Sequence, residues 1–277
     1  MAGLNAADVQ VESRLMLKAV LFDLDDTLMP DESAANEALV ATAAVAKQWH
    51  NVPPGDLKDA VRRVARRLFR ANPIVAAHGS VFDISSWEAL CSSFEGDDDE
   101  LRQLREWAPT YRSEVWNQAL CEIGVCDPLL ADQLSAIYPH ERRNRYVPFP
   151  DVKPCLDRLA VDYRLGVVTN GPCDLQCAKL DASELRGYFG AVLISRQVGI
   201  LKPDPGIFGL ALDQLGTRPQ DAVFVGDTPK TDIVGAHSAG MKAIWLNRDN
   251  VPQPEAIVPD RTIHSLTELE RALASLQ

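Results

Sequence analysis

One stretch near the amino terminus constrains the fold of this 277-residue chain more than any other: residues 20–28, with the sequence VLFDLDDTL. Its apolar beginning predicts a strand buried on both faces of a parallel sheet. Three aspartates follow at the carboxyl end of that strand, where open α/β sheets bind their ligands. Asp23 and Asp25 are two residues apart, so they point the same way if the strand continues. Like charges this close repel unless a cation or a shared proton relieves them, which predicts a metal site. An ordinary acidic turn is the alternative, because aspartate favours turns.

The charge balance limits the partners that the chain can bind. Its formal net charge is −11, which argues against a broad surface for nucleic acid or for an anionic membrane. An anionic substrate would have to be attracted by local lysines, arginines or a bound cation. Hydrophobic residues make up 46% and charged residues 24%, as expected of a globular protein with a substantial core.

Targeting signals and cysteine spacing indicate the compartment. Residues 1–17 lack the apolar segment of a signal peptide, and no stretch of the sequence is long and apolar enough for a membrane-spanning helix. The six cysteines include no Cys-x-x-Cys pair, which favours reduced thiols. We expect a cytoplasmic protein with neither a membrane nor a nucleic-acid partner.

The pattern along the chain changes twice. From about residue 32 to 139 it is helical, and we predict helices over 33–50, 56–71, 84–94, 99–108, 110–122 and 128–138, with a break at Pro109. From Pro150 onward, strands alternate with helices. Strands are predicted at 165–169, 191–195, 222–226, 243–246 and 261–264. Helices are predicted from about 174, over 205–215 and 229–239, and from the capping box Ser265–Glu268. The fold class is therefore α/β, a doubly wound parallel sheet interrupted after its first strand by a helical insert.

Four segments are candidate walls of one site. The first strand supplies Asp23 and Asp25. A later strand ends in Thr169-Asn170-Gly171, a hydroxyl followed by a glycine that lets backbone amides approach an anion. Lys202 comes just before a predicted helix, and Asp227 and Asp232 follow another strand. Carboxylates for a hard cation, a hydroxyl, an amide-rich turn and a lysine are the components that phosphoryl transfer needs.

These four motifs, in this order, resemble those of the haloacid dehalogenase (HAD) superfamily, in the branch whose helical cap is inserted after the first motif. The resemblance covers residues 18–277. It implies a Rossmann-like catalytic core formed by residues 1–30 and 146–277, and a helical cap domain formed by residues 31–145.

The resemblance also implies roles for particular residues. Asp23 would be the nucleophile that forms an aspartyl-phosphate, and Asp25 would be the general acid and base. Mg²⁺ would be bound by Asp23, the backbone carbonyl of Asp25, Asp227 and the phosphate, with Asp232 ligating directly or through water. The phosphate oxygens would be held by Thr169 and by the backbone amides near Asn170 and Gly171. Lys202 would offset charge on the nucleophile and on the transferred group.

Asp25 favours one reaction over others in the superfamily. Carbon–halogen hydrolases lack this second acid, because halide leaves without protonation, so a phosphatase is favoured. The phosphonate-cleaving members need a cap lysine, and Lys47 and Lys58 lie in no recognisable context. The substrate would be a small phosphorylated metabolite: a nucleotide, a sugar phosphate and flavin mononucleotide all remain open, as does the oligomeric state. A phosphomutase of the same superfamily is one alternative, and a non-enzymatic phospho-acceptor signalling module is another.

The insert holds other residues that could bind a ligand. Trp87, Trp107 and Trp116 could stack on a ring, but packing between helices is the favoured role. Arg142 and its neighbours lie where the insert rejoins the sheet. Such arginines are commonly solvated, so a substrate contact there is a minor hypothesis.

Overall fold

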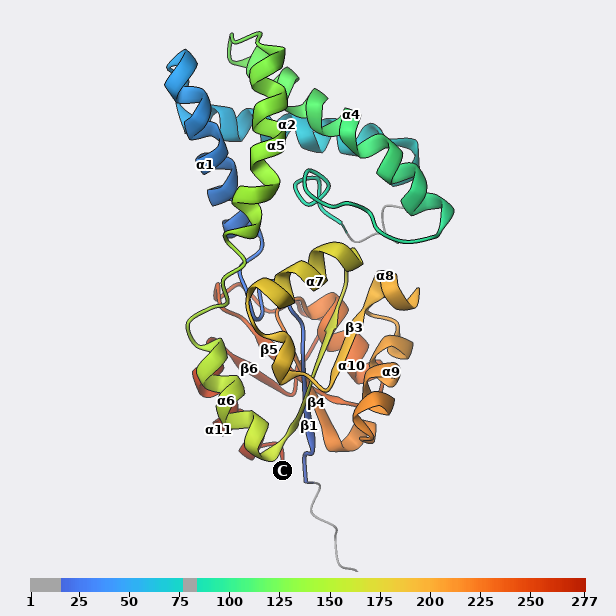
Figure 1. Ribbon diagram of the computed structural model, residues 1–277. Coiled ribbons are helices and arrows are strands. Elements are labelled where there is room, and N and C mark those ends of the chain that lie inside the picture. Colours follow the sequence, from blue (N-terminus) through green and yellow to red (C-terminus); the bar gives the residue numbers. More distant parts are fainter. Residues whose placement is uncertain (1–15, 77–83) are drawn as a thin grey trace, which may run out of the picture.

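The computed structural model describes residues 16–76 and 84–277, and its centre is a sheet of six parallel strands. The strands lie in the order β3-β2-β1-β4-β5-β6 (Figure 1). The chain adds β2 and β3 on one side of β1 and then β4, β5 and β6 on the other, which confirms the doubly wound α/β fold. Their bounds are β1 Ala19–Phe22, β2 Arg164–Thr169, β3 Ala191–Ile194, β4 Ala222–Gly226, β5 Lys242–Leu246 and β6 Arg261–Ile263. The central strand β1 is buried along its whole length, as its apolar sequence predicts.

Helices cover both faces of the sheet because successive side chains of each strand point to opposite faces. One face packs on α6, α7 and α11, and the other packs on α9 and α10. These helices are α6 Val152–Asp162, α7 Cys173–Ala182, α9 Pro205–Leu215, α10 Val234–Ser238 and α11 Leu269–Ala274, and the short helix α8, Ser195–Val198, follows β3 directly. Short 3-10 turns span Arg186–Tyr188, Pro219–Asp221 and Leu266–Glu268, and a π-helical turn, Pro229–Ile233, leads into α10.

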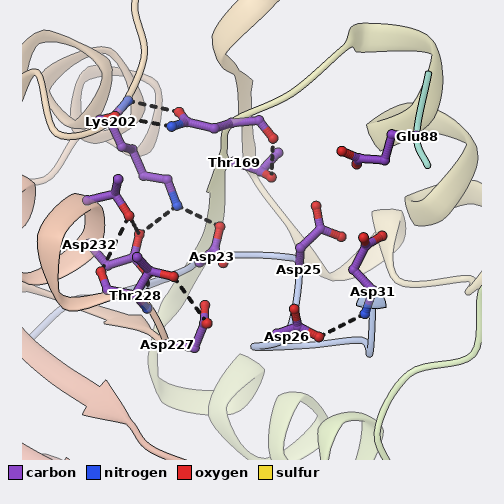
Figure 2. Close-up of a pocket in the computed structure, with 12 residues that line it drawn as sticks. Asp23, Asp25, Asp26, Asp31, Glu88, Thr169, Lys202, Asp227, Thr228 and Asp232 are labelled. Carbon is purple, nitrogen blue, oxygen red and sulfur yellow. Dashed lines mark hydrogen bonds and ion pairs between the residues drawn. The ribbon is translucent and has the colours of Figure 1, made fainter. Parts of the chain in front are cut away.

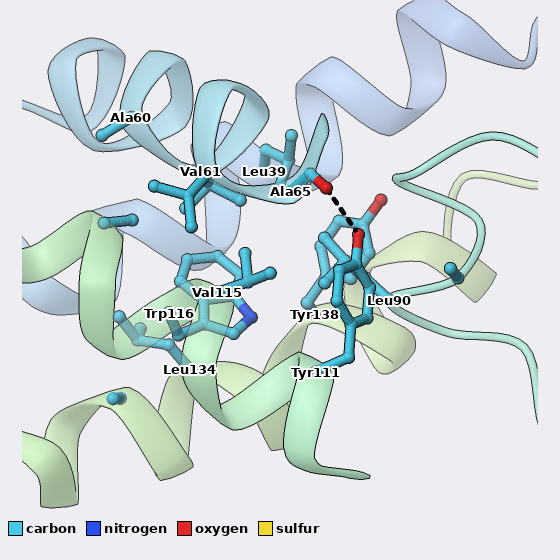
Figure 3. Close-up of a cluster of buried hydrophobic side chains, with 14 of the residues drawn as sticks. Leu39, Ala60, Val61, Ala65, Leu90, Tyr111, Val115, Trp116, Leu134 and Tyr138 are labelled. Atoms are coloured by element: carbon cyan, nitrogen blue, oxygen red, sulfur yellow. Dashed lines mark hydrogen bonds between the residues drawn. The ribbon is translucent and has the colours of Figure 1, made fainter. Parts of the chain in front are cut away.

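Between β1 and β2 the chain forms a second layer of helices above the carboxyl edge of the sheet (Figure 1). Its principal helices are α1 Glu32–His50, α2 Pro54–Ala71, α4 Asp99–Glu122 and α5 Pro128–Arg143. These helices enclose a hydrophobic core of their own, with Trp116 and Tyr138 among its largest buried side chains (Figure 3). The Trp107 ring lies 6.3 Å from that of Phe69 in α2, and the Trp116 ring lies 6.2 Å from that of Tyr138 in α5, so both tryptophans pack between helices as predicted. We call this layer the cap.

Two predicted details of the cap are wrong. The helix α4 continues through Pro109, although an internal proline removes a backbone hydrogen bond. Leu104 and Tyr111, on either side of it, are both buried in the cap core, and this packing outweighs the local cost. Similarly, α5 continues through Pro139 to Arg143.

The segment 84–94 is also not the helix that its sequence predicts. It forms turns over residues 86–91, and residues 92–95 that follow have no regular secondary structure. Phe94 has a left-handed backbone with φ of 52°, and Gly96 follows with φ of 146°, so the chain cannot continue as a helix. The segment instead lies over the edge of the sheet where α7 begins.

Among the described residues, no helix is both long enough and apolar enough to cross a membrane.

Candidate active site

A cavity of about 180 Å³ lies between the cap and the carboxyl ends of β1, β2 and β4. Most of its walls are acidic, and they come from both layers of the molecule (Figure 2). The residues that line it are Asp23, Asp25, Asp26, Asp31, Glu88, Thr169, Asn170, Lys202, Asp227, Thr228, Thr231 and Asp232. The cavity therefore contains seven of the eight residues to which the sequence assigns a role.

Three carboxylates form the acidic centre of this cavity. Oxygen atoms of Asp23, Asp227 and Asp232 all lie within 4.8 Å of one another. Asp23 and Asp227 come together because β1 and β4 are neighbours in parallel register, with Phe22 beside Val225. Asp232 reaches them from the π-helical turn after β4.

A glycine makes room for this arrangement. At Gly226, the last residue of β4, a Cβ atom would collide with the carboxylate of Asp232. The absence of a side chain therefore allows Asp232 to pack directly against the strand end. The Asp232 Oδ2 also accepts a hydrogen bond from the backbone amide of Thr228 at 3.0 Å, which fixes the side chain.

Lys202 is the ammonium at the centre of these carboxylates. Its side chain is only 3% exposed, and its Nζ lies 2.6 Å from Asp23 Oδ1 and 2.7 Å from Asp232 Oδ1. Asn170 holds its backbone: the Asn170 Oδ1 accepts from the Lys202 amide at 2.8 Å, and the Asn170 Nδ2 donates to the Lys202 carbonyl at 3.1 Å. The Asn170 side chain thus helps to position Lys202 as well as lining the cavity.

The electrostatics of this centre favour a cation. Burial, with the neighbouring carboxylates of Asp232 and Asp227, raises the pKa of Asp23 well above its usual range despite the opposing effect of Lys202. Burial and Asp232 raise the pKa of Asp227 to about 7. Burial opposes the charge of Lys202, but Asp23 and Asp232 outweigh it and raise the pKa of this lysine. Three carboxylates around one ammonium leave an excess of negative charge. Oxygen ligands of this kind fit a hard divalent cation.

The phosphate-binding candidates do not all occupy the same place. Thr169 ends β2 and lines the cavity, and its Oγ1 accepts a hydrogen bond from Gln176 Nε2 at 2.6 Å. Gly171 does not line the cavity, and its amide donates to Ser195 Oγ at 3.0 Å. Its φ of 125° permits the turn between β2 and α7, which is a structural use of this glycine.

Asp25 lies beside the acidic centre but has different partners. Its Oδ1 lies 2.7 Å from Lys179 Nζ, and its Oδ2 accepts from Gln176 Nε2 at 2.8 Å. Asp25, Asp31 and Glu88 form a second group of carboxylates. Within this group, Asp31 and Glu88 face Asp25 from the cap side of the cavity (Figure 2). The carboxylate of Asp25 is thus turned away from the candidate metal centre.

Sequence reasoning missed Gln176, Lys179 and Glu88. Gln176 and Lys179 lie one helical turn apart in α7, directly after the second motif, and both are buried. The available signal was the three-residue spacing of these two polar residues, which places them on one face of the first turns of α7. The sequence does not show that this face is buried, because its burial depends on the cap. The expectation for Arg142 was also wrong. Its side chain is 1% exposed and forms an ion pair with Asp31, so it is not a solvated arginine.

The raised pKa values predict how stability depends on pH when divalent cations are chelated. Burial raises the pKa of Asp227 and of Glu88 to about 7, and that of Asp26 to about 6. Between their unfolded and folded pKa values the folded protein binds more protons than the unfolded chain, so the free energy of unfolding falls as pH rises. We expect urea unfolding in a chelator to show a continuous loss of stability from about pH 4 to about pH 7, the interval between the unfolded and the folded pKa values of these groups.

Added Mg²⁺ should reduce that loss, because a cation that binds the ionised carboxylates stabilises the folded protein most at high pH. A stability that increases with pH in the chelator would contradict the electrostatics described above.

The fold is a doubly wound α/β sheet with an inserted layer of helices, and its carboxyl edge holds a cluster of buried carboxylates around a lysine. Residues 17–240 match the family described as haloacid dehalogenase-like hydrolase, and the chain belongs to this family. Family membership makes the protein a hydrolase.

Several curated relatives match most of the chain. It is 35% identical over 257 residues to the phosphoserine phosphatase of Thermus thermophilus, covering 91% of this chain and 98% of the relative. It is 32% identical over 264 residues to the glyceraldehyde 3-phosphate phosphatase of Methanopyrus kandleri, covering 92% of this chain and 96% of the relative. Among solved structures, the 2-haloacid dehalogenase of Pseudomonas syringae pv. Tomato DC3000 is similar at a TM-score of 0.58 and 30% identity, covering 95% of this chain and 100% of the other.

Proposed function

We propose that the protein is a Mg²⁺-dependent phosphatase that hydrolyses a small phosphomonoester through an aspartyl-phosphate on Asp23. The observation that carries this proposal is the presence in one cavity of two carboxylates with different partners. Asp23 lies against Lys202 in the acidic centre, while Asp25 lies outside that centre on Lys179 and Gln176. Two carboxylates in unlike environments can divide the roles of nucleophile and acid between them.

In the first step, an Asp23 carboxylate oxygen attacks the phosphorus atom, and the bond from phosphorus to the ester oxygen breaks. The electron pair of that bond goes to the leaving oxygen, which takes a proton from Asp25. Lys202 Nζ, 2.6 Å from Asp23 Oδ1, orients the nucleophile and offsets the charge of the transferred group. Thr169, at the end of β2, would donate its hydroxyl to a phosphate oxygen in place of the Asn170 carbonyl, to which it donates at 3.2 Å in the structure.

In the second step, Asp25 is ionised and removes a proton from a water molecule, which then attacks phosphorus. The bond between phosphorus and the Asp23 oxygen breaks, which regenerates the Asp23 carboxylate and releases inorganic phosphate. Asp25 is again protonated, so the cycle closes with one ester and one water consumed.

A Mg²⁺ ion would be held by Asp23, Asp227 and the backbone carbonyl of Asp25, with Asp232 as a ligand or as a partner of bound water. The buried excess of carboxylates over ammonium groups supports this assignment. When bound, the cation would supply charge to stabilise the phosphoryl oxygens in the transition state.

We further propose that residues 31–145 act as a cap domain that closes over the substrate and excludes water. The cavity beneath it is small, which favours a compact leaving group. The two phosphatases described above, which match this chain over most of its length, are named for phosphoserine and glyceraldehyde 3-phosphate, both compact phosphomonoesters. We expect this chain to act on a substrate of similar size.

The test is release of inorganic phosphate from a panel of phosphorylated metabolites, each assayed with Mg²⁺ and with a chelator. The panel should include amino-acid phosphates, triose phosphates, sugar phosphates, nucleotides and flavin mononucleotide. We expect metal-dependent release that is concentrated on compact phosphomonoesters. Isomerisation of phosphosugars in excess of phosphate release would instead indicate a phosphomutase. A stable phosphoryl-protein without turnover would indicate a signalling module.

A further inference from the structure

A buried ammonium connects the proposed general acid to the cap. Lys179, in α7, is 1% exposed, and its Nζ lies 2.7 Å from Asp25 Oδ1. The same atom lies 2.9 Å from Asp31 Oδ1 and 3.3 Å from Glu88 Oε1. Lys179 does not itself line the cavity, so it does not touch a bound substrate and acts on the reaction only through its partners.

The position of Asp25 depends on α7. Lys179 holds one oxygen of its carboxylate, and Gln176 holds the other. A carboxylate has about four lone-pair directions, so an oxygen held in this way can still face a leaving group. Because proton transfer needs a defined geometry at hydrogen-bond distance, fixing this carboxylate affects catalysis directly.

Glu88 adds a contribution from the cap to this arrangement. It is held in a capping box: its Oε2 accepts from the Ser85 amide and from the Ser85 hydroxyl, each at 2.9 Å. Its Oε1 remains directed toward Lys179. The following residues dock the same segment on α7, since Ser92 and Ser93 donate hydrogen bonds to Asp174 at distances from 2.6 to 3.2 Å.

We propose that Lys179 is a positioning residue for Asp25, and that through Glu88 it makes the geometry of Asp25 depend on cap docking. This inference rests on the proposed function, in which Asp25 is the general acid. With the cap docked, the ammonium lies between Asp25, Asp31 and Glu88. When the cap lifts, Lys179 loses Glu88 and redistributes between the two aspartates, so Asp25 loses its fixed orientation. Acid catalysis is thereby reserved for the closed enzyme.

The test compares two leaving groups in the Lys179→Met variant, which keeps the length of the side chain and removes its charge. An alkyl phosphate needs its leaving oxygen protonated, whereas p-nitrophenyl phosphate does not. The ratio kcat/KM reports the steps up to cleavage of the ester bond. We expect kcat/KM for the alkyl phosphate to fall about 10- to 100-fold more than that for p-nitrophenyl phosphate. Equal losses on both esters would overturn the proposal.

One reference variant, Asp25→Ala, separates this inference from the proposed function. Asp25→Ala must itself show the leaving-group dependence; if it does not, the role of Asp25 fails. If Asp25→Ala shows the dependence and Lys179→Met does not, only the inference about Lys179 fails. Asp174→Ala weakens the docking of the Glu88 segment on α7 without touching Asp25, so the proposal expects a loss that is selective for the alkyl phosphate but smaller than in Lys179→Met. Equal losses on the two esters would refute the dependence on cap docking.

Lys179→Arg keeps the inference testable if the methionine variant does not fold. Arginine keeps a positive charge close to Asp25, Asp31 and Glu88, but its planar guanidinium group cannot occupy the position of the lysine Nζ. A positioning role predicts that this variant loses alkyl phosphate activity selectively. Full recovery of the wild-type ratio between the two esters would show that charge alone is needed, and would overturn the proposal.

The contribution of the cap is tested with Glu88→Gln. Glutamine can still form the capping box, but it removes the negative charge that faces Lys179. We expect a smaller loss in the same direction, and no additional loss when Glu88→Gln is combined with Lys179→Met, because both act on one interaction. Independent, additive losses would refute the connection to the cap.

Discussion

Replacing Asp23 with asparagine is expected to reduce phosphate release by at least about three orders of magnitude, since removal of a nucleophile has effects of this size. The asparagine amide cannot attack phosphorus, although it has nearly the shape of the carboxylate. The effect should be on kcat, with the fold intact. The measurement is steady-state phosphate release on the best substrate of the panel, with saturating Mg²⁺.

The stability of the same variant provides an independent check. Burial and neighbouring carboxylates raise the pKa of Asp23, so its charge is costly in the folded protein without a cation. Asp23→Asn should therefore unfold at a temperature no lower than the wild type in chelator. Asp204→Asn is a matched control, because Asp204 is the exposed N-cap of α9 and asparagine caps equally well. Retained turnover in Asp23→Asn would refute the assignment of the nucleophile.

Replacing Lys202 with methionine is expected to cost both activity and stability. The variant leaves Asp23 and Asp232 buried without their shared ammonium. Removing one partner of a buried ion pair costs about 3–5 kcal/mol, and we expect a loss near that range in chelator at neutral pH. Turnover should fall by at least about 100-fold, because the lysine also stabilises charge in the transition state.

The sensitivity of this variant to cations and protons identifies the cause of the loss. Mg²⁺ should recover much more stability in Lys202→Met than in the wild type, because the cation would supply the missing positive charge. Lowering the pH should act in the same direction, since it protonates the unpaired carboxylates. Urea unfolding with and without Mg²⁺, at two pH values, measures both effects. A loss of stability that neither cations nor protons relieve would point to lost packing instead.

The sheet and its motifs could be predicted from the sequence because their signals are local. The helix over residues 205–215 matches the structure at both ends, since Asp204 caps it, Pro205 begins it and Gly216 ends it with φ of 56°. The strand ends also follow directly from the sequence, and parallel register then brings Asp23 and Asp227 together. For the same reason the acidic centre could be anticipated from four separate segments.

The features that could not be predicted depend on contacts between distant segments. Pro109 signals a helix end, yet the cap core holds α4 continuous through it. Lys179 reads as an ordinary lysine on the helix after the second motif. It becomes buried only because Glu88 and Asp31, far away in the sequence, close over it. The sequence around Lys179 contains no pattern that predicts these ion pairs.

The insertion of the cap also bears on how the chain folds. The strands β1 and β2 pair directly, although Phe22 and Val167 are separated by the whole cap. The helices α1 and α5 pack side by side, and the two connections to the sheet meet where the Phe149 amide donates to the Leu28 carbonyl at 3.0 Å. Once the cap has collapsed around its own core, its two ends are neighbours. The entropy of closing the loop between β1 and β2 is then that of a short connection, so a large insert places only a small kinetic burden on assembly of the sheet.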